Sequence, residues 1–268
     1  QGMILAYAYE SATGAKVSTD LAEERNGSWF HRETGEPLHQ IVAKMSKSLK
    51  NVVNPDDVVA QYGADSLRLY EMFMGPLDER KPWAEKGVKG VFNFLHRACR
   101  FFSDPANIAG DNEDPEIKRQ LHIAIRKVTL DIENLKFNTA ISALMVFNNA
   151  AMKKGSVTRE TAAGFVKILS PFAPHLGEEL WSLLGNGHSL AYEPWPEADE
   201  NLLVEDTFEY PVSFNGKMRF KIELPATMGI SEIEKEVLQF EKTGRYLEGK
   251  NLKKIIVVPR KIINVVLS

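Results

Sequence analysis

The middle of the chain is dominated by apolar residues that recur every three or four positions. Val88, Val91, Phe92 and Leu95 open the first such run, and this spacing is typical of amphipathic helices. The pattern predicts helices over about 88–102, 115–132, 141–148, 159–169 and 174–185. Because each helix has one apolar stripe to bury, residues 81–187 are predicted to form a helical bundle.

Two shorter helices are predicted before the bundle. Asn54 is a good N-cap and Pro55 suits the first helical position, while Gly63 can end that helix in the left-handed conformation. The stretch ADSLRLYEMFMG repeats this scheme, with Asp65 expected as the cap and Gly75 as the stop.

The two ends of the chain have a different period. Residues 207–268 alternate around Asn215-Gly216, a strong hairpin signal, and end in two β-branched strands. Between them, residues 231–234 (SEIE) are expected to form a capping box that opens one helix. The order ββαββ predicts a small α+β domain. Residues 1–43 carry few helix signals and are expected to form irregular β structure.

These patterns together predict a multidomain, mainly α fold. We expect a first segment at 1–43, a loop with two short helices at 44–80 and the helical bundle at 81–187. A linker rich in proline and acidic residues is expected at 188–206, and the α+β domain at 207–268.

Composition narrows the class of protein. The 268 residues are 44% apolar and 26% charged, with a net charge of −3, so any nucleic-acid contact must come from local patches. A single cysteine, Cys99, excludes a disulfide framework and the four-cysteine or two-cysteine, two-histidine zinc sites, and it favours the cytoplasm. No apolar run reaches the roughly 20 residues of a membrane span. The chain opens without an initiator methionine or a signal peptide, which suggests that it is cut from a longer protein.

The stretch KMSKS, residues 44–48, carries the clearest candidate chemistry. The ammonium groups of Lys44 and Lys47 could approach negative charge that develops on a leaving pyrophosphate, and the hydroxyls of Ser46 and Ser48 could donate hydrogen bonds to phosphate. Met45 completes the loop. The alternative is a solvated basic turn without a substrate, which five residues alone leave equally open.

The surroundings of this loop decide between the two. The stretch KMSKSLKNVVNPDDVVAQYGADSLRLYEMFMGP closely resembles the region around the second signature motif of class I aminoacyl-tRNA synthetases. The similarity continues through KPWAEKGVKGVFNFLHRACRFF, SPFAPHLGEELW, NGKMRFKIELP and KKIIVVPRKIINVV. In that order these stretches resemble the C-terminal part of the bacterial-type leucyl-tRNA synthetase family, over about residues 41–268.

The resemblance implies a concrete activity. The family activates leucine with ATP and Mg²⁺ and then transfers it to a terminal ribose hydroxyl of tRNA(Leu). Lys44 and Lys47 match the lysines that hold ATP phosphates, and residues 44–48 match the whole ATP-binding loop. The bundle would be the anticodon-binding domain and the small C-terminal domain would bind tRNA. Neither a membrane nor DNA is expected as a partner, and no metal is expected to be held by this chain.

Departures from the family limit this expectation. The first signature, of the H-x-G-H type, is absent, because PHLG at 174–177 lacks the second histidine. The first half of the catalytic domain and the editing domain are not found either. We therefore expect the chain to be inactive alone. The alternative is a stand-alone tRNA-binding module, or a non-catalytic subunit, whose KMSKS loop is vestigial.

Basic residues of the last domain are the second candidate site. The domain has 11 Lys and Arg against 7 Asp and Glu. One group alternates along a strand and should share one face, and another flanks the last hairpin. The candidates for tRNA contact are Lys217, Arg219, Lys221, Lys253, Lys254, Arg260 and Lys261. The alternative is a solvated sheet face, whose edge lysines deter aggregation.

Overall fold

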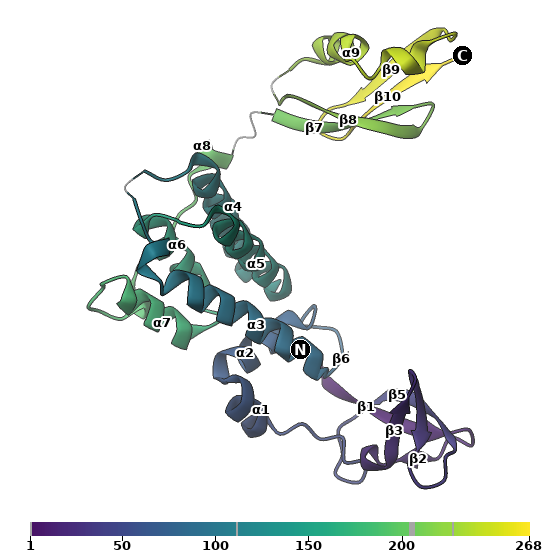
Figure 1. The fold of residues 1–268 in the computed structure, drawn as a ribbon, viewed down its shortest axis with the longest axis vertical. Coiled ribbons are helices and arrows are strands. Elements are labelled where there is room, and N and C mark those ends of the chain that lie inside the picture. Colours follow the sequence, from purple (N-terminus) through teal and green to yellow (C-terminus); the bar gives the residue numbers. More distant parts are fainter. Residues whose placement is uncertain (1, 111, 204–206, 227) are drawn as a thin grey trace. The chain divides into compact units, whose positions relative to one another are not determined.

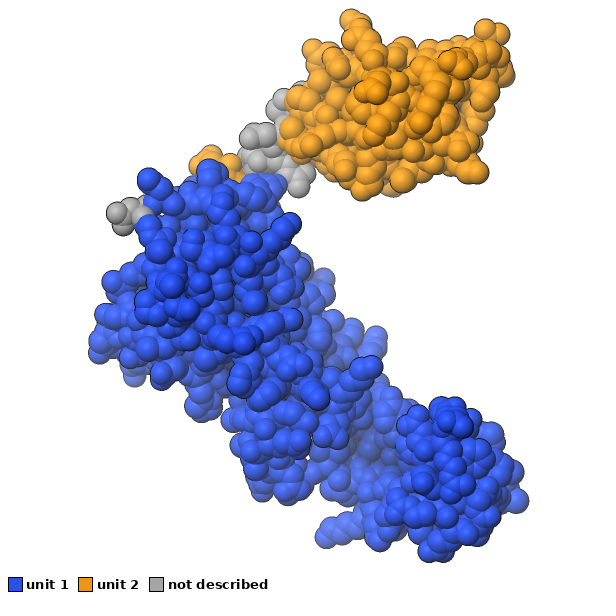
Figure 2. All heavy atoms as spheres, in the orientation of Figure 1, with its two compact units in different colours: residues 1–199 blue, residues 200–268 orange. Residues whose placement is uncertain are grey.

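The protein was analysed as a computed structural model that describes residues 2–110, 112–203, 207–226 and 228–268. Residues 1, 111, 204–206 and 227 belong to the predicted first segment, bundle, linker and small domain, and they are outside the described residues. The chain divides into two compact units, residues 1–199 and residues 200–268, which Figure 2 colours separately. The finer division of residues 1–206 stays a prediction.

The first unit begins with a β-sheet, drawn in purple in Figure 1. Its strands are β1 (Ile4–Ser11), β2 (Lys16–Val17), β3 (Ala22–Arg25), β4 (Ser28–His31), β5 (Pro37–Ala43) and β6 (Lys81–Pro82), in the order β2-β1-β5-β4-β3 with β6 beside β1. Strands β1 to β5 pair in antiparallel fashion, whereas β6 runs parallel to β1. Residues 4–43 therefore form a regular sheet rather than the irregular β structure expected for 1–43, because strands too short to show a clear period pair with neighbours that are distant in sequence.

Two short helices follow, α1 (Pro55–Tyr62) and α2 (Ala64–Phe73). Asn54 caps α1 as predicted, since its side chain accepts a hydrogen bond from the Asp56 amide at 3.2 Å. The predicted cap of α2 is wrong. Gly63 occupies the N-cap position, at φ +85°, and Asp65 lies within the first turn, where its carboxylate serves a different helix.

The five predicted bundle helices are confirmed. They are α3 (Glu85–Phe102), α4 (Pro115–Glu133), α5 (Phe137–Lys154), α6 (Arg159–Leu169) and α7 (Pro174–Leu183). Their apolar stripes meet in one core that also takes in Leu69 and Tyr70 of α2. Tyr70 lies edge-on against Trp83, with ring centres 4.9 Å apart, and a side chain at Gly87 would collide with the Tyr70 ring. These contacts fix the start of α3 on α2.

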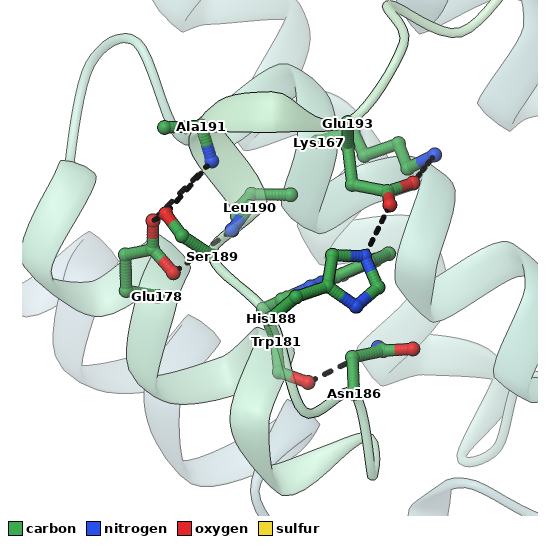
Figure 3. A network of polar contacts seen from close by, with 9 residues as sticks. All are labelled: Lys167, Glu178, Trp181, Asn186, His188, Ser189, Leu190, Ala191 and Glu193. Atoms are coloured by element: carbon green, nitrogen blue, oxygen red, sulfur yellow. Dashed lines mark hydrogen bonds and ion pairs between the residues drawn. The ribbon is translucent and has the colours of Figure 1, made fainter.

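The segment after α7 is held against the bundle by carboxylates (Figure 3). Glu178 accepts hydrogen bonds from the Leu190 and Ala191 amides and from the Ser189 hydroxyl, at the 3-10 turn η3 (Leu190–Tyr192). Glu193 lies 2.7 Å from the ammonium of Lys167 and 2.5 Å from the His188 ring, and the Lys167 contact contributes most to lowering the pKa of its carboxyl.

The chain after Glu193 continues along α4. The indole N–H of Trp195 donates to the Thr129 hydroxyl at 2.8 Å, and the Asp199 amide donates to His122 at 2.9 Å. Residues 188–199 thus pack on the bundle and belong to the first unit, although their composition is that of a linker.

The second unit has one four-stranded sheet. Its elements are α8 (Glu200–Leu203), β7 (Thr207–Phe214), β8 (Lys217–Pro225), α9 (Ile230–Gln239), α10 (Gly244–Leu247), β9 (Leu252–Val258) and β10 (Ile262–Leu267). The order is β8-β7-β10-β9, with β7 and β10 parallel in the centre. The Asn215-Gly216 turn is confirmed, with both residues at positive φ. The predicted capping box is shifted, because Glu232 accepts from the Gly229 amide at 2.9 Å and α9 begins at Ile230.

Over the described residues the fold class is therefore mixed helix and strand, with two sheets, rather than mainly α. Among the described ranges, we find no helix with both the length and the apolar character that a bilayer crossing requires.

The Asp131 carboxylate at the end of α4 generates a stability prediction. It is almost fully buried, binds the Lys127 ammonium and accepts from the Thr139 hydroxyl at 2.6 Å. Asp131→Ala removes the acceptor of both contacts and leaves the Thr139 hydroxyl only its bond to the Lys136 carbonyl, at 3.0 Å, so we expect the free energy of unfolding to fall by about 1–3 kcal/mol. Asp131→Asn, which keeps one acceptor, should cost less. Urea unfolding followed by the helical circular-dichroism signal measures both.

Glu133→Ala, an exposed change two residues further along α4, is the matched control and should change stability by less than about 0.5 kcal/mol. Equal stability of the Asp131→Ala and Glu133→Ala proteins would show that the Asp131 contacts contribute nothing.

Candidate functional site

The KMSKS loop starts where β5 ends. Residues 44–48 lie between that strand and α1, in a segment without helix or strand. The side chains of Lys44, Lys47 and Ser48 are exposed, whereas Met45 and Ser46 are half-buried. The side chains of Lys44 and Lys47 therefore extend into solvent near the end of β5, whereas the half-buried Met45 and Ser46 keep the loop close to the protein.

Asn51 organises the base of this loop. Its side chain is 7% exposed and its oxygen accepts from the Ser46 amide at 2.8 Å. Its amide nitrogen donates to the carbonyl of Lys44 at 3.4 Å and to the carbonyl of Tyr7, in β1, at 3.3 Å. One buried side chain therefore joins the first and third residues of the loop to β1.

The far end of the loop is tied to residues 19–20. The Thr19 amide donates to the Leu49 carbonyl at 2.9 Å, and the Thr19 hydroxyl donates to the Lys50 carbonyl at 2.6 Å. The Lys50 ammonium lies 2.6 Å from the Asp20 carboxylate, and this contact lowers the pKa of Asp20 to about 2. Lys50 has φ +48°, a left-handed conformation that costs energy in a residue with a Cβ. These contacts hold it there.

The helices after the loop are fastened to the bundle. Asp65 of α2 accepts hydrogen bonds from the Leu176 amide at 2.8 Å and lies 2.8 Å from the ring nitrogen of His175. Arg68 donates two hydrogen bonds to the Pro171 carbonyl, at 2.9 and 3.0 Å. A carboxylate at a helix start is favoured by the free amides there. The start of α7 is thus capped by a residue of α2.

This arrangement presents two ammonium groups on an exposed loop whose base is fixed. Within the described ranges, Lys44 and Lys47 form no ion pair with an acidic side chain, whereas Lys50 beside them does. Free ammonium groups of this kind can bind phosphate oxygens through charge-assisted hydrogen bonds.

The predicted basic patch of the second unit is divided by the sheet. Lys217, Arg219 and Lys221 are on β8, at one edge, whereas Lys253 and Lys254 are on β9, at the other. All five are exposed. Arg260 and Lys261 lie in the β9–β10 turn. Two central strands therefore separate the two groups.

The β8 residues also differ among themselves. The pairing of β7 with β8 shifts so that Arg219 is the extra residue of a bulge, and its guanidinium lies 5.5 Å from the centre of the Tyr246 ring. Lys221 instead pairs with Glu209 at 2.5 Å. The expectation that the three side chains share one face is wrong, because the bulge breaks the alternation.

Sequence reasoning did not identify four residues that support the KMSKS site. They are Thr19, Asp20 and Asn51, and Asp65 as the residue that binds the start of α7. Asn51 stands three positions after the motif, and its polar side chain before the apolar pair Val52-Val53 is the only signal it offers. The partners of the other three are distant in sequence, so no local pattern marks them.

No group of three or more His, Cys, Asp or Glu side chains that could hold a metal ion comes together among the residues that the structure describes.

Two segments of the chain match known protein families. Residues 40–79 match the class I tRNA synthetases of the isoleucyl, leucyl, methionyl and valyl group, and residues 114–234 match the anticodon-binding domain of tRNA ligases. Among solved structures, the chain is similar to the agnB2 LeuRS of Agrobacterium radiobacter, crystallised as a ternary complex with tRNA and LeuAMS. The identity is 36% and the TM-score 0.70 over 84% of this chain.

The chain spans about a third, 32%, of the length of that LeuRS chain. The matched segments include the whole KMSKS loop, the helices α1 and α2 and the bundle helices α4 to α7. The resemblance read from the sequence is confirmed: the chain is LeuRS-like, and it joins residues of a class I tRNA synthetase domain to an anticodon-binding domain of tRNA ligases.

Proposed function

We propose that the whole protein containing this chain is a leucine–tRNA ligase of the cytoplasm. In this reaction the leucine carboxylate attacks the α-phosphorus of ATP, the bond to the β-phosphate oxygen breaks and pyrophosphate leaves. The adenylate then passes leucine to a terminal ribose hydroxyl of tRNA(Leu) and releases AMP. The observation that carries the proposal is the pair of exposed lysines on an anchored KMSKS loop in a chain that also contains an anticodon-binding domain.

The loop residues have distinct proposed roles. The ammonium groups of Lys44 and Lys47 bind the β- and γ-phosphates and stabilise the charge that builds on the departing pyrophosphate. Met45, Ser46 and Ser48 complete the ATP-binding loop. Mg²⁺ enters with ATP as part of the substrate, and no step of the proposal uses a protein ligand to it.

Recognition of tRNA is assigned to the bundle and to the second unit. The similar LeuRS structure is a complex with tRNA, which supports tRNA as the partner of this protein. We propose that Lys217, Arg219, Lys221, Lys253, Lys254, Arg260 and Lys261 contact the tRNA backbone. Such contacts read phosphates and helical shape rather than sequence.

Lys47→Ala tests the role of the loop. In the complete enzyme that contains this chain, we expect leucine-dependent ATP–pyrophosphate exchange to slow at least tenfold, about 1.4 kcal/mol of barrier, because one ammonium no longer meets the leaving group. Steady-state isotope exchange measures the rate. Lys16→Ala, another exposed lysine of the same sheet, is the matched control and should leave the rate unchanged.

An unaltered exchange rate in the Lys47→Ala enzyme would refute the proposed role of the loop. If tRNA binding nevertheless persisted, the chain would be the tRNA-binding module with a vestigial loop that the sequence left open.

The two edges of the second unit can be tested separately. We expect affinity for tRNA(Leu) to fall as salt rises, because phosphate contacts release counterions. Removing two lysines at one edge (Lys217→Ala with Lys221→Ala) or at the other (Lys253→Ala with Lys254→Ala) should weaken binding and flatten the slope of log K against log salt by roughly one to two. Filter binding over a salt series measures this slope.

Lys235→Ala with Lys242→Ala is the matched control, since both lysines are exposed but lie on and after α9 rather than on a sheet edge. A slope that stays the same in both edge variants would show that these lysines are merely solvated.

A further inference from the structure

The buried amide of Asn51 lies outside the five-residue motif, yet it forms hydrogen bonds with two motif residues, Lys44 and Ser46, and with Tyr7 of β1. We propose that Asn51 is a positioning residue for leucine activation: it fixes the base of the KMSKS loop so that the Lys47 ammonium reaches the pyrophosphate. This inference rests on the proposed function and assigns a residue to it.

The chemistry of the three contacts requires a carboxamide. Asn51 accepts one hydrogen bond, from the Ser46 amide, and donates two, to the carbonyls of Lys44 and Tyr7. An asparagine side chain offers both an acceptor and two donors, whereas an aspartate at neutral pH only accepts. Asp at position 51 would keep the Ser46 contact and set a negative charge against two carbonyl oxygens.

The contacts with Asn51 and Thr19 hold the backbone of the loop at both of its ends. Asn51 binds the backbone of Lys44 and Ser46, and Thr19 binds the backbone of Leu49 and Lys50. Lys47 and Ser48 remain between these anchors, with exposed side chains. The position of Lys47 is therefore set by the anchored residues on either side of it, Ser46 and Leu49.

Position matters greatly for a group that must meet developing charge. A displacement of about 1 Å in a catalytic group can cost roughly a hundredfold in rate. Loss of one anchor should therefore lower the rate of leucine activation by displacing Lys47. It should have little effect on leucine binding, since no residue of the loop is proposed to bind leucine.

The test is a double-mutant cycle in the complete enzyme. Asn51→Asp should lower kcat for leucine-dependent ATP–pyrophosphate exchange at least tenfold, while KM for leucine changes less than about twofold. In the Lys47→Ala background the same change should cost less than about threefold, because the group being positioned is already gone. Asn26→Asp, in the exposed β3–β4 turn of the same sheet, is the matched control and should leave kcat unchanged.

The outcomes distinguish the proposed function of the protein from the proposed role of Asn51. A normal rate in the Lys47→Ala enzyme removes the proposed function, and this inference with it. A slow Lys47→Ala enzyme beside a normal Asn51→Asp enzyme overturns the inference alone. Equal rate losses from Asn51→Asp in both backgrounds also overturn it, because Asn51 would then act independently of Lys47.

Thr19→Val keeps the proposal testable if the Asn51→Asp enzyme does not fold. Valine matches threonine in shape but lacks the hydroxyl that binds the Lys50 carbonyl at 2.6 Å. We expect kcat to fall about three- to tenfold in the otherwise normal enzyme and to stay unchanged in the Lys47→Ala background. A normal kcat in the Thr19→Val enzyme would show that anchoring of the loop does not set the rate.

Discussion

Two polar side chains of α2 hold the loop-bearing part of the first unit on its helical bundle. Asp65 caps α7, and Arg68 binds the Pro171 carbonyl just before that helix. Both partners are backbone groups, so the contacts fix the direction of the helices and not merely their separation. Because α1 and α2 follow the KMSKS loop directly, the orientation of Lys44 and Lys47 relative to the anticodon-binding domain depends on this junction.

How far the sequence predicts this molecule depends on the range of each interaction. The bundle helices were predicted because their apolar stripes are long, and α4 in addition has a local cap, Asp114, which accepts from the amides two and three residues later. Asp65 carries the same local signal, yet a tertiary contact takes its carboxylate. The regular sheet of residues 4–43 was not predicted. Its short strands are stabilised by pairing with neighbouring strands, and they do not show a clear alternation of apolar and polar residues.

The candidate site divides in the same way. The motif lysines are visible in the sequence because the chemistry of phosphate needs them. Their anchors are not visible, since Thr19 and Tyr7 are about 30 and 44 positions from the residues they bind. The basic residues of the second unit were found by type, but their distribution over two sheet edges follows from the strand order, which alternation along one strand does not reveal.

The parallel pairing of β7 with β10 has a consequence for how the second unit folds. The β7–β8 and β9–β10 hairpins can each form locally, but Val212 meets Ile263 only after the chain between them has closed a large loop. The Asn215 side chain, which accepts from the Leu267 amide at 2.8 Å, and Asn264, which accepts from Gly216, lock the two hairpins together. Docking of two preformed hairpins should therefore set the pace of folding, and its transition state should contain the closed loop.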